Sequence, residues 1–425
     1  MHRSDLRFFL FAFSLIITQF SFGQDWPQFR GPHGNGHADA MKLPTQWSES
    51  ENVDWKTELP GRGWSSPVIS NNQVWMTSAI ETENGPVELI AICVDKTSGQ
   101  IQHQVSLFKL DKDEKIHVLN SYASPTPVIS ADRVFCHFGN YGTACLNLKS
   151  GMVIWKTNRF HYDTQDNGPG ASPVVWKNLL LFNCDGRDVQ FAVALEQKSG
   201  KVVWKVERSG KLHDNKDFQK SYCTPAILQT EGVEQLVSPA ADWVYSYDPK
   251  TGRELWKVNY GQLGFSTVPK PVFHGGTAFI LTSYMKSKLL AIDCLATKKQ
   301  SSGSTTATIK WTSSSNMPQK PSLLVIEQNL YAINDKGILT CLRTDTGKTI
   351  FQHRIRGNFS ASPIYAGGHL YFCDQSGETT VLKHGNQHQQ VAKNQLDGKL
   401  MASPAVADGS IFLRTDKAIY RIGQE

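Results

Sequence analysis

The sequence predicts an all-β fold: an eight-bladed β-propeller of four-stranded antiparallel blades, the last blade closed by an N-terminal strand. Two patterns predict it. Tryptophan follows glycine by four residues in a recurring turn-and-strand unit, at Gly151 and Trp155, Gly200 and Trp204, and Gly252 and Trp256. Proline before an apolar pair marks eight strand starts, 41 to 60 residues apart, at Pro67, Pro127, Pro173, Pro225, Pro271, Pro321, Pro363 and Pro404. Proline suits the first residue of a strand, where its missing N–H costs little.

Residues 1–23 have the pattern of a signal peptide. Arg3 and Arg7 precede an apolar run over residues 8–20, which is too short to span a bilayer comfortably. Small residues then stand at 21 and 23, so we expect cleavage after Gly23; the alternative is an uncleaved anchor. No later segment is long and apolar enough to cross a membrane. We therefore expect an exported chain, periplasmic or extracellular, without a transmembrane segment once it is mature.

The charge of the chain argues against nucleic acid as a partner. The net charge is +6, and cleavage removes Arg3, Arg7 and Asp5, which leaves +5. This charge is spread out, with no block rich in lysine and arginine. A composition of 40% hydrophobic and 19% charged residues is that of a globular chain.

Residues 24–50 precede the repeats and form an N-terminal arm. The stretch 26–32, Trp-Pro-Gln-Phe-Arg-Gly-Pro, is irregular and carries aromatic anchors. We expect this arm to be a strap on the outside of the domain. Residues 51–425 then form the propeller.

Two irregular units complete the ring. The eighth unit, after Pro404, has room for only three strands, and residues 53–56 carry the Trp-Lys ending of a fourth strand. We expect this N-terminal strand to close the ring and leave no free edge. In the fifth unit, the Ser/Thr-rich stretch 298–308 replaces the glycine turn, and we expect a mobile loop there. The tryptophans are expected to pack against the adjacent blade.

The repeat over residues 194–205, Ala-Leu-Glu-Gln-Lys-Ser-Gly-Lys-Val-Val-Trp-Lys, resembles the tryptophan-docking repeats of pyrroloquinoline-quinone (PQQ) dehydrogenases. It also resembles those of non-enzymatic propellers such as the outer-membrane assembly lipoprotein BamB. The resemblance covers nearly the whole mature chain. With the opening at 26–32, the chain is similar to exported PQQ-like propellers of planctomycete-type bacteria, whose activity is unassigned. The resemblance implies an eight-bladed propeller, with fold alone leaving function open.

The quinone dehydrogenases carry a disulfide between adjacent cysteines, calcium ligands of Glu, Asn and Asp type, and an Asp base. This sequence has no adjacent cysteine pair, and no matching ligand set is found. We therefore expect no cofactor and no enzymatic activity, with PQQ and calcium kept as the alternative.

The cysteines are expected to be core residues. One position near the end of the third strand can be compared in six units. Its residues are small, which is typical of a buried position: Cys93, Cys145, Ala194, Ser246, Ala291 and Cys341. Cys136 and Cys145 flank one hairpin; we favour two free thiols over a cross-strand disulfide. No CxxC or Cys/His cluster has zinc spacing.

Strand order places the candidate binding residues. The segments before each blade proline and the turns between second and third strands share one face, the usual binding face of propellers. The candidate ligand residues on that face are Tyr122, Asp185, Asp188, Tyr222, Asp242, Trp243, Lys270, Lys286, Lys320 and Asp335.

Lys270 and Lys320 stand where six other units have serine or threonine before the blade proline. The pair is a candidate positive patch for a carboxylate or phosphate. The alternative is two solvated lysines, or lysines paired with Asp242 or Asp335. Asp185 and Asp188 are either metal ligands or turn residues that bond their own backbone.

These observations favour a non-catalytic binding or scaffolding module for a protein partner or a small anionic ligand. A quinone-dependent oxidoreductase is the first alternative. Carbohydrate or polymer binding, with Trp243 and Tyr222 stacking on a ring, is the second.

Overall fold

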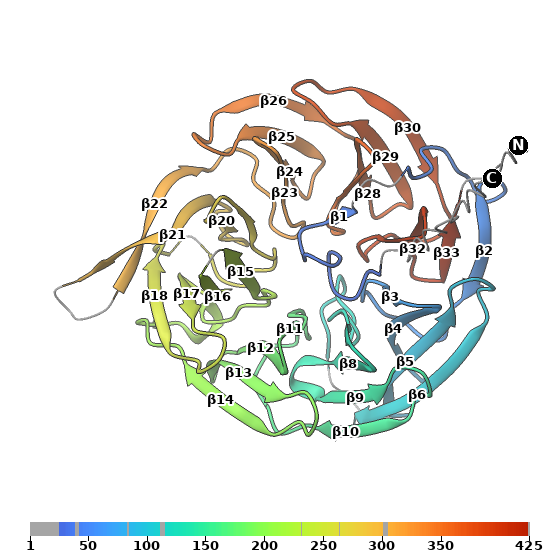
Figure 1. The fold of residues 1–425 in the computed structure, drawn as a ribbon, viewed down its shortest axis with the longest axis horizontal. Coiled ribbons are helices and arrows are strands. Elements are labelled where there is room, and N and C mark those ends of the chain that lie inside the picture. The colour runs from blue at the N-terminus through green and yellow to red at the C-terminus, as the bar shows by residue number, and fades with distance from the viewer. Residues whose placement is uncertain are drawn as a thin grey trace, which may run out of the picture.

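The computed structural model describes residues 25–38, 42–82, 85–110, 115–230, 232–262, 264–300 and 305–423. Eight sheets, each containing a blade of four antiparallel strands, stand around a central channel (Figure 1). The predicted eight-bladed propeller is confirmed. The predicted signal peptide lies outside the described residues and stays a prediction.

The innermost strand of a blade is short because it lines the narrow channel. These strands, in blade order, are β3 (Val68–Ser70), β7 (Val128–Ser130), β11 (Val174–Trp176), β15 (Ala226–Thr230), β19 (Val272–His274), β23 (Leu324–Ile326), β27 (Ile364–Ala366) and β31 (Ala405–Ala407).

The two middle strands of each blade are almost entirely buried. The second strands are β4 (Gln73–Ile80), β8 (Arg133–His137), β12 (Leu179–Asp185), β16 (Val233–Pro239), β20 (Thr277–Leu281), β24 (Asn329–Ile333), β28 (His369–Cys373) and β32 (Ser410–Arg414). The third strands are β5 (Val87–Asp95), β9 (Thr143–Asn147), β13 (Gln190–Glu196), β17 (Trp243–Tyr247), β21 (Leu289–Lys299), β25 (Ile338–Arg343), β29 (Glu378–Lys383) and β33 (Ala418–Ile422).

The outer strands alternate between exposed and packed residues. They are β6 (Ile101–Leu110), β10 (Val153–Thr157), β14 (Val202–Glu207), β18 (Glu254–Asn259), β22 (Thr305–Ser313), β26 (Thr349–Arg354), β30 (Gln390–Gln395) and, in the last blade, β2 (Val53–Glu58). The described helices are two short 3-10 turns, η1 (Gly139–Tyr141) and η2 (Lys216–Phe218). Within the described ranges, no helix has the length and apolar character needed to span a bilayer.

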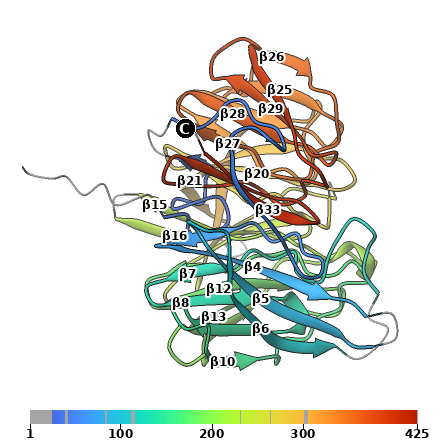
Figure 2. The same cartoon turned by 90° about the vertical axis from the view of Figure 1, so that its right-hand side faces the viewer.

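The ring closes as predicted. β2 pairs antiparallel with β33, with Val53 opposite Ile422 and Thr57 opposite Ile419, so the eighth blade joins both ends of the chain. Figure 2 shows the ring from the side, where the last blade (β33, dark red) meets the first (β4 to β6, blue to teal). The backbone N–H of Ser403 donates to the Ser66 hydroxyl across this junction at 3.1 Å.

Tryptophans on the outer strands join neighbouring blades. Four rings lie against the turn glycine of the next blade, and each indole N–H donates to the carbonyl three residues before that glycine, at 2.9 to 3.1 Å. The pairs are Trp55 on Gly99, Trp155 on Gly200, Trp204 on Gly252 and Trp311 on Gly347. A β-carbon at Gly200 would lie 2.7 Å from the Trp155 ring, so only glycine fits. The predicted packing against the adjacent blade is confirmed at these four positions.

Trp256 is the exception among the repeat tryptophans. Its indole N–H donates to Gln235 Oε1 of its own blade at 2.8 Å. The next blade has no glycine turn to receive it, because residues 298–308 mostly extend the β21–β22 hairpin. The expected mobile loop is therefore wrong for the residues described there, which form paired strands; residues 301–304 lie outside the described ranges. The hairpin projects from the ring in Figure 1.

The core lies between blades. One cluster joins Phe135 and Cys145 of the second blade to Phe182 of the third, whereas Cys136 belongs to the cluster shared with the first blade. Cys145 is opposite Phe135 and Cys136 is opposite Ala144, so the two thiols face opposite sides of the sheet. All eight cysteines are buried and free, which decides against the disulfide.

A ring of hydroxyl groups fixes the inner wall. In seven of the eight blades, the residue two before the innermost strand donates its backbone N–H to the side-chain hydroxyl of the corresponding residue in the next blade, at 2.8 to 3.1 Å. We call these residues the hydroxyl ring: Ser66, Thr126, Ser172, Thr224, Ser322, Ser362 and Ser403. The eighth position is Lys270, which cannot supply a hydroxyl to Thr224.

The N-terminal arm runs through the channel, and the expected strap on the outside is wrong. Trp26 exchanges two backbone hydrogen bonds with Ile69 of β3, at 2.8 and 2.9 Å. The arm then reaches the fifth blade, where the Phe29 carbonyl accepts from Lys270 Nζ at 3.3 Å. β1 (His37–Ala38) pairs parallel with β27 of the seventh blade, and appears in blue inside the ring in Figure 1. At Trp47 the chain leaves the channel, and the backbone N–H of Trp47 donates to Asn394 Oδ1 of β30 at 2.9 Å. The arm enters the channel because large apolar rings such as Trp26 are stabilised by burial, and Trp26 is fully buried there.

Candidate functional site

A cup of about 970 Å³ occupies the mouth of the channel on the predicted binding face. The hydroxyl ring forms its lower wall, and Phe29 of the arm also lines it. Because the arm crosses the channel, the cup has a floor and is not an open pore. We call this cavity the cup.

One half of the cup has higher walls than the other. The segments that lead into the second, third and fourth blades are 111–127, 158–173 and 208–225, each about twice as long as 59–67, 355–363 and 396–404 on the other side. Residues from the long segments supply most of the cup's amide, carboxylate and lysine side chains. The polar side chains of the cup therefore lie mostly beside blades two to four, where the connecting segments are longest.

Lys220 is the cation best placed for a ligand. It is 1% exposed, lines the cup, and donates from Nζ to the Gln165 amide oxygen. Its ammonium lies 5.7 Å from the centre of the Phe265 ring. Burial lowers the pKa of Lys220 below its ordinary value. In the described part of the chain it forms no ion pair; the carboxylates of Asp217 and Asp163 act on its charge from a longer distance.

Aromatic side chains line the cup beside Lys220. Phe218 stacks on Phe265 with centroids 4.6 Å apart, and Tyr284 meets Phe265 edge-on at 5.6 Å. Tyr222 is held by two hydrogen bonds, from Asn167 Nδ2 at 2.9 Å and to the Thr164 carbonyl at 3.0 Å. These contacts fix the rings before any ligand enters. The sequence pointed to Tyr222 but not to the others, which lie in segments without a repeat signal.

The predicted Lys270–Lys320 patch does not form. The strand of the sixth blade begins at Leu324, so the residue equivalent to Lys270 is Ser322 and not Lys320. Lys320 lines the cup and is paired with Asp335 at 2.9 Å, which is the alternative that the sequence left open. Lys270 is 4% exposed and its Nζ donates to the Phe29 carbonyl at 3.3 Å, below the cup.

Asp185 and Asp188 have structural partners. Asp185 is 1% exposed and forms two hydrogen bonds with Arg208, at 2.8 and 2.9 Å. Burial alone would lower the pKa of Arg208, but the charge of Asp185 raises it above its ordinary value. Asp188 accepts the backbone N–H groups of Asp163 and Val189 at 2.8 and 2.9 Å, as a turn aspartate does.

The other sequence candidates lie outside the cup. Trp243 packs on Gly210 and donates to the Lys211 carbonyl at 3.0 Å, which occupies the face expected to stack on a sugar. Asp242 is 9% exposed, and burial raises its pKa. Tyr122 is a core residue 5.9 Å from the Tyr141 ring, and Lys286 is exposed. Of the ten candidates, Tyr222 and Lys320 line the cup.

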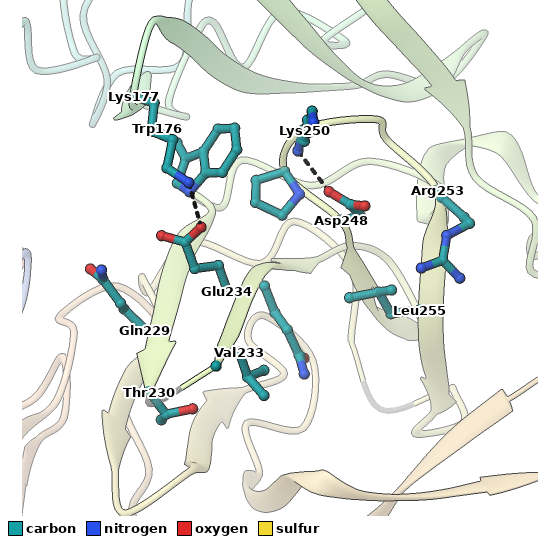
Figure 3. A pocket seen from close by; sticks show the side chains of 13 residues that line it. Trp176, Lys177, Gln229, Thr230, Val233, Glu234, Asp248, Lys250, Arg253 and Leu255 are labelled. Carbon is teal, nitrogen blue, oxygen red and sulfur yellow. Dashed lines mark hydrogen bonds and ion pairs between the residues drawn. The ribbon is translucent and has the colours of Figure 1, made fainter.

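A second hollow, of about 670 Å³, lies at the opposite face between the third and fourth blades (Figure 3). β15 has five residues where the other innermost strands have three, and its hairpin with β16 forms one wall. Lys177 pairs with Glu234 at 2.9 Å and lies 4.3 Å from the Trp176 ring centre. The charges of this hollow are thus partly matched by a direct ion pair, whereas Lys220 has none within the described residues.

The cup was tested for the quinone and calcium that PQQ propellers bind. Among the residues that the structure describes, no three His, Cys, Asp or Glu side chains come together as a metal site. Asp217, one of the two carboxylates that line the cup, is paired with Arg187 at 3.2 Å. No two cysteines are adjacent in the sequence. The described residues of the cup thus offer neither the adjacent cysteines nor a cluster of three such metal-binding side chains.

Comparisons with curated proteins give one distant relative. The tetrathionate hydrolase of Acidithiobacillus ferrooxidans is 23% identical over 257 residues, which is 58% of this chain. The match spans about half, 48%, of the length of that relative.

Solved structures share the fold. BamB from Moraxella catarrhalis has a TM-score of 0.59 at 14% identity, over 87% of this chain and 97% of its own. A europium-containing methanol dehydrogenase has 0.66 at 11% identity, over 92% and 89%. A quinohemoprotein alcohol dehydrogenase from Comamonas testosteroni has 0.65 at 9% identity, over 94% and 81%. At these identities the likeness establishes the fold and not the activity.

The sequence family described as outer membrane protein assembly factor BamB matches residues 164–390, more than half of the 425 residues. The match begins before the third blade and ends at the outer strand of the seventh. The chain therefore belongs to this family of PQQ-like repeat β-propellers.

Proposed function

We propose that the chain is an exported, non-catalytic binding module that holds a small polar ligand with an anionic group in the cup. The observation that carries this proposal is Lys220, a nearly buried ammonium that lines the cup without an ion pair in the described residues. A buried charge is costly unless a partner of opposite charge meets it. A ligand carboxylate would supply that partner.

The rest of the cup narrows the ligand class. Hydroxyl and amide groups surround Lys220, and the Phe265 and Tyr222 rings are exposed to the same cavity. Sugars are recognised by such a combination of aromatic faces and planar polar side chains. An acidic sugar has a carboxylate for Lys220 and a ring for the aromatic side chains. It therefore combines the anionic-ligand and carbohydrate hypotheses drawn from the sequence.

Calorimetric titration of the mature protein with glucuronate and galacturonate tests this proposal. We expect binding that Lys220→Met weakens at least tenfold and that Lys286→Met, an exposed lysine outside the cup, leaves unchanged. Equal affinity in both variants would contradict the role of Lys220. PQQ with calcium forms the second arm, and a saturable signal there would revive the cofactor.

A protein partner is the second candidate, favoured by the apolar rim of the cup. Val118, Leu119, Tyr284 and Met285 are 77, 48, 59 and 58% exposed, and Leu119 and Tyr284 also line the cup. Clustered exposed apolar side chains commonly mark an interaction surface. A photo-crosslinker at Met285 should capture a partner that one at Val203, exposed on an outer strand, does not. Equal capture at both positions would remove this candidate.

Export is part of the proposal and has its own test. It depends on residues 1–23 and is consistent with an outer-membrane family. N-terminal sequencing of protein recovered from the periplasm should begin at Gln24. A chain that begins at Met1 would overturn it.

A further inference from the structure

Arg30 brings a buried positive charge into the channel. It is 1% exposed and belongs to the arm, where its Nη2 donates to the Asn35 carbonyl at 2.7 Å. Its Nε and Nη1 are buried and have no hydrogen-bond partner among the residues that the structure describes. Two other buried arginines have more partners. Arg208 forms an ion pair with Asp185, and Arg414 Nη1 donates to three oxygens at 2.6 to 3.1 Å.

Lys270 adds a second positive charge at the same place. Its Nζ bonds to Phe29 O, on the residue before Arg30, and a β-carbon at Gly34 would lie 2.4 Å from it. It is the one position at which the hydroxyl ring lacks a hydroxyl. Burial and the neighbouring Arg30 lower its pKa to about 7, and burial lowers the pKa of Arg30 to about 9.

The two charges need compensation that the described residues do not provide. Neither Arg30 nor Lys270 forms an ion pair within the described ranges. Water would satisfy the free N–H groups of Arg30 but would leave two like charges together in a medium of low dielectric constant. The arm would then be held in the channel against electrostatic repulsion.

We propose that a small monovalent inorganic anion, of the halide class, binds between Arg30 and Lys270 and holds the arm in the channel. The free Arg30 N–H groups and the Lys270 ammonium are its donors. Because Phe29 of the same arm lines the cup, the anion also fixes the floor of the ligand cavity. The site is separate from Lys220 and does not depend on the proposed ligand of the cup.

Thermal unfolding of the mature chain in sodium chloride and in sodium gluconate of equal ionic strength tests this site. We expect chloride to raise the melting temperature saturably, by roughly 2–4 °C, because only the folded chain holds it. Lys270→Met should abolish the difference between the salts, and the exposed control Lys286→Met should keep it. No difference in the wild type, or a full difference in Lys270→Met, would overturn the proposal.

Two further measurements cover the remaining outcomes. Asp39 lies outside the described residues but close in sequence to β1. If Asp39→Asn is needed before chloride has any effect, that carboxylate is the natural counter-ion and the anion site is refuted. Should Lys270→Met not fold, a wild-type crystal soaked in bromide decides the matter. An anomalous peak beside Arg30 supports the site, and its absence refutes it.

Discussion

The inner and outer walls of the ring are both built on an eight-fold repeat, but their irregularities differ in kind. On the outer wall, His103 replaces tryptophan beside Gly151 and its Nε2–H donates to the Lys149 carbonyl at 3.0 Å, so packing continues with another residue. On the inner wall, Lys270 interrupts the hydroxyl ring at the point where the arm crosses. The irregularity at Gly151 is repaired by packing, whereas the one at Lys270 coincides with the crossing of the arm and with a charge that has no ion pair within the described residues. Function is therefore expected on the inner wall.

The largest expected effect comes from opening the ring. Deletion of residues 51–57 removes most of β2 and leaves β33 as a free edge in the eighth blade. It also removes Trp55, which packs on Gly99 of the first blade. We expect a loss well above the roughly 3–5 kcal/mol of a single Trp→Ala change, with broad, non-cooperative melting followed by circular dichroism. An unchanged melting temperature would contradict closure by β2.

Removing one docking tryptophan tests the outer wall alone. Trp204 is 8% exposed and joins the third blade to Gly252 of the fourth. Trp204→Ala should cost about 3–5 kcal/mol in urea unfolding, because a buried ring and its hydrogen bond to Pro249 are lost. Trp176→Ala, on a ring that does not dock on a turn glycine, is the matched control and should cost clearly less. Equal losses would refute the special role of the docking ring.

Removing one hydroxyl tests the inner wall. Ser362→Ala leaves the buried N–H of Ser322 without its acceptor at 3.0 Å, which should cost about 1–3 kcal/mol. Ser360→Ala, in the same segment but outside the ring, should cost less. The comparison fails if the two changes are indistinguishable by urea unfolding.

His137 is a buried side chain that is neutral in the folded protein, in contrast to the buried charge of Lys270. It is fully buried, bonds through Nδ1 to the Thr143 hydroxyl at 2.8 Å, and burial lowers its pKa from 6.5 to about 3. The unfolded chain therefore binds a proton that the folded chain does not, between pH of about 6.5 and 3. Stability should fall in this range as pH falls, by about 1.4 kcal/mol per pH unit from this residue. His137→Gln should flatten the slope of stability against pH; the same slope would exclude His137 as its source.

The repeat made the fold predictable and the site only partly so. Spacing from Gly200 to Trp204 identifies a blade, and the missing fourth strand locates β2, because both depend on periodic packing. The arm contains no repeat unit, so the spacing of residues could not predict its path through the channel. Its aromatic residues indicated only that it packs against the domain. The sequence aligned Lys320 with Lys270 because Pro321 resembles a strand start. The strand begins at Leu324, so the equivalent residue is Ser322, two residues later. Lys220 lies in a segment whose length, rather than any motif, distinguishes it.

Native mass spectrometry of the mature protein recovered from the periplasm tests the central claim most directly. The account predicts a non-covalent small-molecule adduct on the wild type that is retained by Lys286→Met and lost by Lys220→Met. The wild-type protein at its bare mass, or the same adduct on Lys220→Met, would contradict the proposal that the cup holds an anionic ligand through Lys220.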